Sequence, residues 1–367
     1  MKFLEITFVD PEIPGGVERF AFQLGQFLSN HSIDVTYIFS GDKEQVYVHN
    51  GIKKIMIKCN RKLFPKIFFN IKVYFYVKKH RLEYDIVHIN GDNGDLIARI
   101  RGIKTLMTVH GSALKEGLSG KNNKALKIIN KLNKIASAYI SHIFEIYGMK
   151  RAGIIVSTSP AYIDFINLYR NKDDIVVIPL GVDTDFFKPG EKNEIRKELS
   201  MNLDALYGIW VGQDRNRKKL EFAIDVIEKT KSNLICIGDT NTDKKVSNKI
   251  ILLKNISDKY LLEYYQASDF FLFPSKYEGF GLAILEAMAC GSVPIIDQNI
   301  KIPVLSQGTN CFIAERDSDY FNIITTIENN RSILSEMSKE AVKSAGKLSV
   351  TNNLFRYLDI IDHYYKN

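Results

Sequence analysis

The sequence predicts an α/β protein built from two Rossmann-like domains. Its 367 residues are enough for two domains of typical size. Both halves alternate short apolar runs, typical of buried strands, with stretches whose apolar residues recur at helical spacing. We therefore expect domains at residues 1–178 and 179–348 that face a central cleft, followed by a last helix over residues 349–367. In such sheets, ligands bind at the carboxyl ends of the strands.

The bulk composition is that of an ordinary globular protein, with 45% hydrophobic and 25% charged residues. No apolar run reaches the roughly 18 residues that cross a bilayer. The first ten residues contain Glu5 within their apolar run and lack a small-residue cleavage site, so they predict a buried strand and no signal peptide. The four cysteines are scattered without metal-type spacing, which favours free thiols in a reducing, cytoplasmic compartment.

The formal net charge is +8. Such an excess of positive charge suggests nucleic acid, an anionic membrane surface or an anionic substrate as partner. No helix-turn-helix, zinc finger or aromatic RNA-binding pattern accompanies it, so we expect no nucleic-acid partner.

The first strand, ending near Asp10, leads into Gly15-Gly16 and a helical pattern. The free N–H groups at such a helix start favour an anionic ligand. Only two adjacent glycines are present, which argues against the Gly-x-Gly-x-x-Gly fingerprint of a dehydrogenase. Alone, the pair is equally compatible with a plain turn.

Five further strands are expected in the first domain, at residues 34–39, 50–58, 85–90, 105–110 and 153–159. His110, followed by Gly111, ends the fourth of these and should therefore lie at the ligand edge of the sheet. The alternative is a structural histidine. His88 lies in the adjacent strand without a following glycine, and we predict that it is structural.

Two basic, amphipathic helices are expected at residues 61–81 and 121–143. In the first, the predicted apolar stripe is Phe64, Ile67, Phe68, Ile71, Tyr74 and Phe75. In the second, it runs from Ala125 to Ile143 and includes Tyr139. Each helix either packs on a core with a solvated lysine face, or lies at an interface with anionic lipid headgroups.

In the second half, the predicted strands are residues 205–212, 233–238, 250–253, 269–273 and 293–297. Gly212 ends the first of these and is followed by a cationic turn that contains Arg215, Arg217 and Lys218. Such a turn suits a diphosphate, because arginine donates paired hydrogen bonds and lysine supplies a compact charge. An ordinary solvated basic turn is the alternative.

The most informative stretch runs from Glu278 through Gly279, Phe280, Gly281 and Leu282 to Glu286. It follows a short buried strand, so the order is strand, glycine loop, helix. The glycines let backbone N–H groups approach a ligand. Glu286, about two turns into the helix, can accept two hydrogen bonds from a vicinal diol such as a ribose.

Glu-x7-Glu around Gly-Phe-Gly resembles the pattern of the retaining glycosyltransferases of family 4, which have the GT-B fold. The Gly-Gly loop, Thr-Val-His-Gly at residues 108–111, Gly181-Val182-Asp183 and the Arg/Lys turn resemble the family in the same order. The resemblance implies catalytic roles for His110 and Glu278. It implies donor binding by Gly15, Gly16, Arg217, Lys218, Gly279, Phe280, Gly281, Leu282 and Glu286.

The same resemblance implies a UDP- or GDP-linked sugar donor, a glycan or lipid-linked acceptor, and a last helix that crosses back to the first domain. It also implies transfer without a metal or other cofactor, with the leaving diphosphate stabilised by cations and helix N–H groups. We therefore assign no metal role to Asp183-Thr-Asp185. The chain departs from the family at Gln213 and Lys219, which leaves open whether Arg215 or Arg217 contacts the phosphate. Ile302-Pro303-Val304 stands in place of the family's Gly-x-Pro-Glu, so a supporting carboxylate is missing. The alternatives are a sugar-nucleotide epimerase of the same fold and a non-catalytic sugar-nucleotide sensor.

Overall fold

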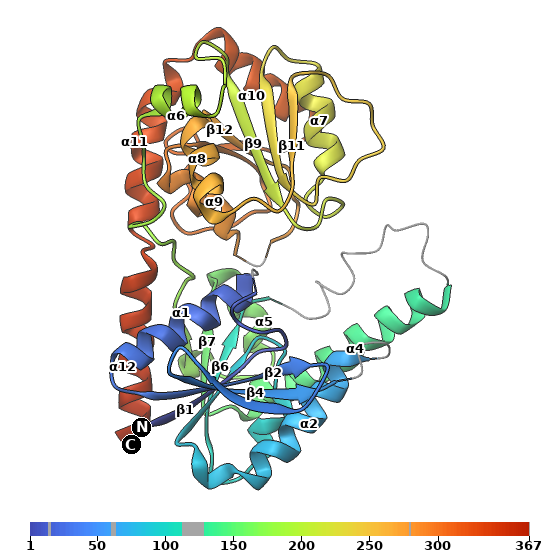
Figure 1. Cartoon of the computed structure of the whole chain (residues 1–367), viewed down its shortest axis with the longest axis vertical. Helices are drawn as coiled ribbons and strands as arrows, with labels where there is room; N and C mark the ends of the chain where they lie inside the picture. Colours follow the sequence, from blue (N-terminus) through green and yellow to red (C-terminus); the bar gives the residue numbers. More distant parts are fainter. Residues whose placement is uncertain (14–15, 60–63, 112–127, 279, 367) are drawn as a thin grey trace. The chain divides into compact units, whose positions relative to one another are not determined.

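The computed structural model describes residues 1–13, 16–59, 64–111, 128–278 and 280–366. The chain forms two compact units (Figure 1). Unit 1 comprises Met1–Leu180 and Asn353–Asn367, and unit 2 comprises Gly181–Asn352. Each unit has a mainly parallel sheet between helices, which confirms the predicted α/β fold of two Rossmann-like domains.

Unit 1 contains an eight-stranded sheet with the order β3-β4-β2-β1-β5-β6-β7-β8. Its strands are β1 (Lys2–Ile6), β2 (Asp34–Gly41), β3 (Gln45–His49), β4 (Ile52–Lys58), β5 (Ile86–Asn90), β6 (Lys104–Val109), β7 (Ile154–Ser157) and β8 (Ile175–Val177). All neighbours are parallel except β3, which runs antiparallel to β4 at the edge. The sequence pattern does not indicate β3, because four of its five residues are exposed and the strand shows no buried alternation.

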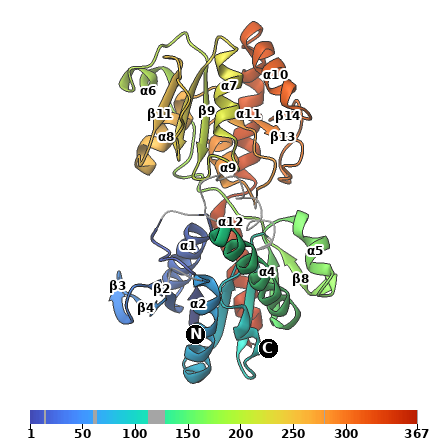
Figure 2. The same cartoon turned by 90° about the vertical axis from the view of Figure 1, so that its right-hand side faces the viewer.

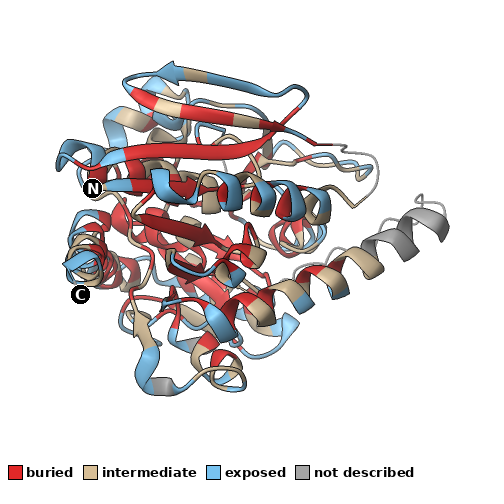
Figure 3. Ribbon diagram, turned by 90° about the horizontal axis from the view of Figure 1, so that it is seen from below, coloured by how far each residue is buried: buried red, intermediate tan, exposed pale blue. Residues whose placement is uncertain are grey.

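The longer helices of unit 1 are α1 (Gly16–Asn30), α2 (Pro65–Lys79), α4 (Ile128–Arg151), α5 (Ile163–Asn167) and most of α12 (Val350–Lys366). Short 3-10 turns occur at Arg81–Glu83, Asp95–Arg99, Pro160–Tyr162 and Lys172–Asp174. Buried residues follow the strands and the inward faces of the helices, and exposed residues lie along the outer faces (Figure 3). The core of unit 1 therefore lies between the sheet and its covering helices.

The orientation of α2 differs from the prediction. The residues that it buries are Phe69, Asn70, Val73 and Val77. Three members of the predicted apolar stripe are exposed instead, with Phe68 at 44%, Ile71 at 37% and Phe75 at 62%. The prediction was wrong because α2 is apolar on two sides, so that its spacing alone does not show which side meets the sheet.

Helix α4 runs beside α2 (Figure 2). Residues 121–127 of the predicted second basic helix lie outside the described residues. In the later part of α4 the buried positions include Ala138, Ser141 and Met149. Tyr139 and Ile143, which were predicted to lie on the packed face, are 52% and 61% exposed. The face of α4 that meets the core is thus rotated relative to the prediction.

Unit 2 contains a six-stranded parallel sheet with the order β11-β10-β9-β12-β13-β14. Its strands are β9 (Tyr207–Gly212), β10 (Asn233–Gly238), β11 (Ile250–Leu253), β12 (Phe270–Phe273), β13 (Val293–Asp297) and β14 (Phe312–Ala314). Its helices are α6 (Lys192–Glu198), α7 (Leu220–Glu228), α8 (Asp258–Ala267), α9 (Leu282–Ala289), α10 (Asp317–Asn329) and α11 (Ile333–Gly346). The order places β9 and β12 side by side at the centre, so the loops that follow them emerge together at the carboxyl edge.

The last helix, α12, begins at Val350 in unit 2 and continues into unit 1. Its Asn353 side chain donates to the carbonyl oxygen of Pro179 over 2.8 Å. Lys104, at the start of β6, donates to the carbonyl oxygen of Tyr364 over 2.7 Å. Aromatic contacts join α12 to α1, with the rings of Phe355 and Phe27 4.9 Å apart. These contacts hold the C-terminal segment on unit 1.

Candidate active site

The cationic turn of unit 2 links β9 to α7. The side chain of Lys218 lies against Gly212, where an added Cβ would be 2.4 Å from Cδ of the lysine. The indole N–H of Trp210 donates to the carbonyl oxygen of Lys218 over 2.9 Å, which fixes the turn. Only 13% of the Lys218 side chain is exposed. Burial lowers the pKa of this ammonium group, and the nearby carboxylates Glu278 and Glu286 oppose that effect.

Arg217 points from the same turn to the loop after β12. Its guanidinium donates to the carbonyl oxygen of Tyr277 over 3.0 Å, and to Oε1 of Glu278 over 2.6 Å. Arg215 forms no side-chain hydrogen bond or ion pair within the described part of the chain. The structure therefore places Arg217, and not Arg215, next to the acidic residue of the glycine loop.

One carboxylate oxygen of Glu278 accepts hydrogen bonds from two side chains. Its Oε1 accepts from Arg217 and from the hydroxyl of Ser275 over 3.0 Å, and it lies 3.8 Å from Nζ of Lys218. The side chain is only 10% exposed. Two cations from one loop and a carboxylate from another thus form a single charged group with an excess of positive charge, which suits an anionic ligand.

The glycine loop leads directly into α9. Gly279 lies outside the described residues. Phe280 is buried, and Gly281 is the residue that precedes the helix, with a φ of +84° that favours glycine. Leu282 is the first residue of α9. The N–H of Ile284 donates to the carbonyl oxygen of Gly281 over 2.9 Å. The N–H groups of Leu282 and Ala283 precede the hydrogen-bonding pattern of the helix, so they suit an electron-rich ligand.

Glu286 lies one turn further along α9 and is only 9% exposed. The hydroxyl of Tyr265, on α8, donates to its Oε2 over 3.3 Å. Its charge acts on Lys218, whose ammonium group lies 4.8 Å from the centre of the Phe273 ring on β12. The cations Arg217 and Lys218 come from one stretch of the sequence and the carboxylates Glu278 and Glu286 from a distant one, and the fold brings the two pairs together at the carboxyl edge of the unit 2 sheet.

His110 belongs to unit 1, where it directly follows β6. It is 7% exposed, and its Nε2 lies 2.5 Å from Oδ1 of Asn90, at the end of β5. Burial and the neighbouring His88 lower the pKa of His110 to about 3, so the ring is neutral at physiological pH. A neutral imidazole can accept or donate a hydrogen bond, but it cannot act as a cationic acid.

The helix start predicted for the first glycine pair is present. Gly16 is the first residue of α1, and an added Cβ there would meet no atom within 4 Å. Gly15 lies outside the described residues. The structure thus supplies the expected helix N-terminus but gives no contact that assigns a ligand to it.

Two family models match this chain. The model described as "Glycosyltransferase Family 4" matches residues 14–186, and the one described as "Glycosyl transferases group 1" matches residues 191–344. The chain is a family-4-type glycosyltransferase with the GT-B fold.

Two curated relatives resemble most of this glycosyltransferase. An Escherichia coli UDP-Gal:alpha-D-GlcNAc-diphosphoundecaprenol alpha-1,3-galactosyltransferase is 25% identical, over 94% of this chain and 90% of its own. An alpha-monoglucosyldiacylglycerol synthase from Acholeplasma laidlawii is 26% identical, over 78% of each chain.

Solved structures share the fold of the glycosyltransferase along almost the whole chain. A sucrose-phosphate synthase from Thermosynechococcus elongatus matches with a TM-score of 0.81 at 18% identity, covering 100% of this chain and 99% of its own. HepE from Anabaena, in complex with UDP-glucose, matches with a TM-score of 0.74 at 15% identity, covering 99% and 100%.

Asp183 of the glycosyltransferase, which begins the Asp-x-Asp sequence, has a local structural role. Its carboxylate accepts hydrogen bonds from the backbone N–H groups of Asp185 and Phe186, each over 3.1 Å. This arrangement is the usual way in which an aspartate caps a turn. Within the described ranges, no cluster of three or more His, Cys, Asp or Glu side chains is arranged to hold a metal ion.

Three side chains that hold the predicted site residues of the glycosyltransferase were not predicted from the sequence. Ser275 donates to Glu278, Tyr265 donates to Glu286, and Asn90 contacts His110. For Asn90 a signal was available, because a polar residue at the last position of a buried strand lies at the same edge as His110. Ser275 and Tyr265 carry no comparable signal, since serine and tyrosine are common at such positions.

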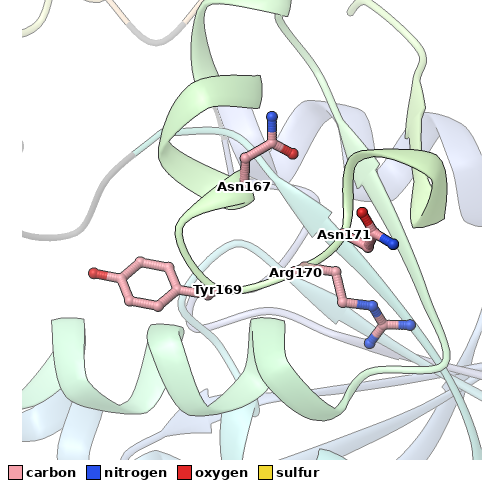
Figure 4. A pocket seen from close by; sticks show the side chains of 4 residues that line it. All are labelled: Asn167, Tyr169, Arg170 and Asn171. Carbon is pink, nitrogen blue, oxygen red and sulfur yellow. The ribbon is translucent and has the colours of Figure 1, made fainter.

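A shallow hollow on unit 1 is lined by Asn167, Tyr169, Arg170 and Asn171 (Figure 4). The guanidinium of Arg170 donates to the carbonyl oxygen of Ala152 over 2.6 Å and pairs with Asp174 at 3.1 Å. Its donors therefore hold the chain around β7, and we assign this hollow no role in the glycosyltransferase.

Among the helices that the structure describes, none combines the length and the apolar character that a membrane crossing needs. All four cysteines of the glycosyltransferase are buried free thiols.

Proposed function

We propose that this glycosyltransferase moves a sugar, with retention of its anomeric configuration, from a UDP- or GDP-linked donor to a glycan or lipid-linked acceptor. The observation that carries the proposal is the convergence of Arg217, Lys218, Glu278 and Glu286 in unit 2. A sugar nucleotide offers a diphosphate to the cations, a ribose diol to Glu286 and sugar hydroxyls to the glycine loop.

The transfer step itself needs charge stabilisation at the departing diphosphate. As the bond between sugar and phosphate breaks, negative charge grows on the diphosphate and positive charge on the sugar ring. Lys218 and Arg217 compensate the former, together with the free N–H groups at the start of α9. In this proposal no metal ion is required, and the leaving phosphate helps to deprotonate the acceptor. Glu278 holds the cations in place and lies beside the sugar, and for His110 we propose a hydrogen bond to a substrate hydroxyl.

The acceptor class is supported by a hollow of unit 1. This hollow, of about 500 Å³, lies at the carboxyl ends of β1, β2 and β4. Its lining includes Phe8, Phe39, Met56 and Pro65. The names of the Escherichia coli and Acholeplasma laidlawii relatives describe an undecaprenol-linked acceptor and a glucolipid product. We propose that the acceptor of this chain is likewise lipid-linked, and that the hollow receives its apolar portion.

We further propose that the enzyme works in the cytoplasm, at the inner face of the cell membrane. Phe68, Ile71 and Phe75 form an exposed apolar row on α2, and Tyr139 and Ile143 lie exposed on the neighbouring α4. Lys72, Lys78 and Lys79 fall beside this row at helical spacing, whereas Lys66 pairs with Asp92 at 2.8 Å. Apolar side chains beside lysines are typical of helices that rest on anionic lipid.

Flotation with liposomes tests the membrane proposal. Wild type should float with anionic vesicles and not with neutral ones, and added salt should weaken this binding. Phe68→Ser combined with Phe75→Ser should reduce flotation. Leu168→Ser is the matched control, because Leu168 is 72% exposed but lies after α5. Binding that is insensitive to lipid charge, or equal loss in both variants, would contradict the proposal.

A thermal-shift screen of nucleotide sugars tests the donor proposal, since a true donor raises the melting temperature. The best donor is then incubated with a lipid-linked acceptor, in the presence and absence of EDTA, and the anomeric configuration of the product is determined by NMR. A product with retained configuration that forms in EDTA supports the proposal. Sugar isomerisation without acceptor would instead identify an epimerase, and donor binding without turnover would identify a sensor.

A further inference from the structure

A network of buried polar side chains surrounds His110 inside unit 1. Its members come from β1, β5, β6 and α12, and none is more than 7% exposed: Glu5, His88, Asn90, Thr108, His110 and Tyr357. Burying so many polar groups is costly unless each finds a partner. We call this set the His110 network.

The amide of Asn90 joins His110 to Glu5. Its Nδ2 lies 3.0 Å from Oε1 of Glu5, and its Oδ1 lies 2.5 Å from Nε2 of His110. An amide has one donating and one accepting end. Because the oxygen of Glu5 accepts, the nitrogen of Asn90 must face Glu5 and its oxygen must face His110. The ring nitrogen Nε2 of His110 therefore has to carry the hydrogen.

The orientation of Glu5 is fixed in turn by His88. Oε2 of Glu5 lies 2.6 Å from Nδ1 of His88, whose Nε2 lies 2.7 Å from Oγ1 of Thr108. The hydroxyl of Thr108 lies 3.2 Å from that of Tyr357, on α12. Whether the proton between Glu5 and His88 resides on the carboxyl or on the ring, Oε1 of Glu5 is left to accept from Asn90. The direction of the amide is thus the same in both cases.

The other ring nitrogen of His110 is left without a partner. Nδ1 is buried and has no hydrogen-bond partner among the described residues. In a neutral ring with its hydrogen on Nε2, Nδ1 presents a lone pair. A buried acceptor of this kind suits a donor that arrives with a ligand, and sugars offer hydroxyl groups as donors.

We propose that Glu5 and Asn90 are positioning residues that hold His110 in the Nε2–H tautomer, so that its Nδ1 accepts a hydrogen bond from a substrate hydroxyl. The tautomer follows from unit 1 alone, whereas the role of the hydroxyl rests on the proposed function. If the network were purely structural, replacing Asn90 would lower the stability of the protein but would leave its kcat unchanged.

Nitrogen-15 NMR of the histidine rings tests the tautomer in the ligand-free protein. The His110 signals are assigned by their loss in His110→Gln. Wild type should show the Nε2–H form. Asn90→Leu removes the hydrogen-bond acceptor and leaves a side chain of similar size. It should lower the Nε2–H fraction. It should also reduce kcat about tenfold or more and change the donor KM less than threefold. Asn90→Asp keeps an acceptor for Nε2 and should retain the tautomer.

Thr108→Val is the control for lost stability, because it removes a hydroxyl of the His110 network and leaves the bond between Asn90 and His110 in place. It should keep the Nε2–H tautomer whatever its melting temperature. An Nδ1–H ring in wild type, or an unchanged tautomer in Asn90→Leu, would overturn the inference. If Asn90→Leu does not fold, an Nδ1–H ring in Asn90→Asp overturns it equally. The spectra need no donor, so a failed tautomer result and a failed transferase assay are separate outcomes.

Discussion

Nη1 of Arg217 lies 2.6 Å from Oε1 of Glu278, so a predicted phosphate-binding cation and a predicted catalytic carboxylate form an ion pair with each other. Both side chains are largely withdrawn from solvent, with 25% and 10% exposed. In the ligand-free protein the pair compensates charges that would otherwise be poorly solvated. We expect an arriving diphosphate to compete with Glu278 for this guanidinium.

The ion pair predicts non-additive effects in a double-mutant cycle. Arg217→Gln and Glu278→Gln should each lower the free energy of unfolding, because each removes the closest counter-charge of the other group. The double variant should lose less than the sum, with a coupling of about 1–2 kcal/mol. Urea unfolding of the four proteins measures the coupling. Strict additivity would show that the two groups do not interact in solution.

Replacing Lys218 should weaken donor use. Lys218→Ala removes the most enclosed cation of the turn, so we expect a higher donor KM and a loss of about 100-fold in kcat/KM. Steady-state kinetics with the best donor measures this loss. Lys231→Ala is the matched control, because Lys231 is exposed and precedes β10, at the opposite edge of the sheet. Near-normal turnover of Lys218→Ala would mean that the phosphate site is misplaced.

Glu286→Ala should also act on the donor. Loss of the carboxylate removes the acceptor for the ribose diol, and we expect the donor KM to rise about tenfold or more. Tyr265→Phe, which removes only the hydroxyl that donates to Glu286, should have a much smaller effect. Donor titrations of both variants give the comparison. Equal KM values in Glu286→Ala and wild type would exclude a ribose contact.

Burial of His110 predicts a pH-dependent stability. Its folded pKa of about 3 lies below the unfolded value near 6.5, so the unfolded chain binds a proton first. This group therefore contributes full stability above pH 6.5, and the contribution is lost as pH falls toward 3. At pH 5 the loss amounts to about 2 kcal/mol.

Urea unfolding at pH 7.5 and pH 5 checks this sign. His110→Gln should lose about 2 kcal/mol less than wild type between the two pH values. His363→Gln, at an exposed position on α12, should behave as wild type. A steeper loss in His110→Gln would contradict a depressed pKa.

The two sides of α2 predict opposite outcomes for two phenylalanines. Phe69 is fully buried, so Phe69→Ala should cost about 3–5 kcal/mol of stability. Phe75 is 62% exposed, so Phe75→Ala should change stability by about 0.5 kcal/mol or less. Chemical unfolding of both variants makes the comparison. If the two costs were similar, the assignment of the buried side of α2 would be wrong.

The sequence located most strands because buried parallel strands are short, apolar and bounded by breakers. It missed β3, an exposed edge strand, and also β8 and β14, which have only three residues each. It also recognised the residue types around Glu278 and Glu286. The sequence could not show that Arg217, and not Arg215, reaches Glu278. Both arginines lie in the same turn, and only the directions of their side chains differ.

The chain alone determined the α/β class, the order of its motifs and the chemical character of each loop, because these depend on local periodicity and residue type. Only the tertiary structure decided which side of α2 and α4 meets the core, which cation pairs with Glu278, and how Asn90 and Glu5 orient His110. Those outcomes depend on contacts between segments far apart in the chain. Such contacts depend on how whole helices and strands pack, and they cannot be predicted from the residue pattern within one segment.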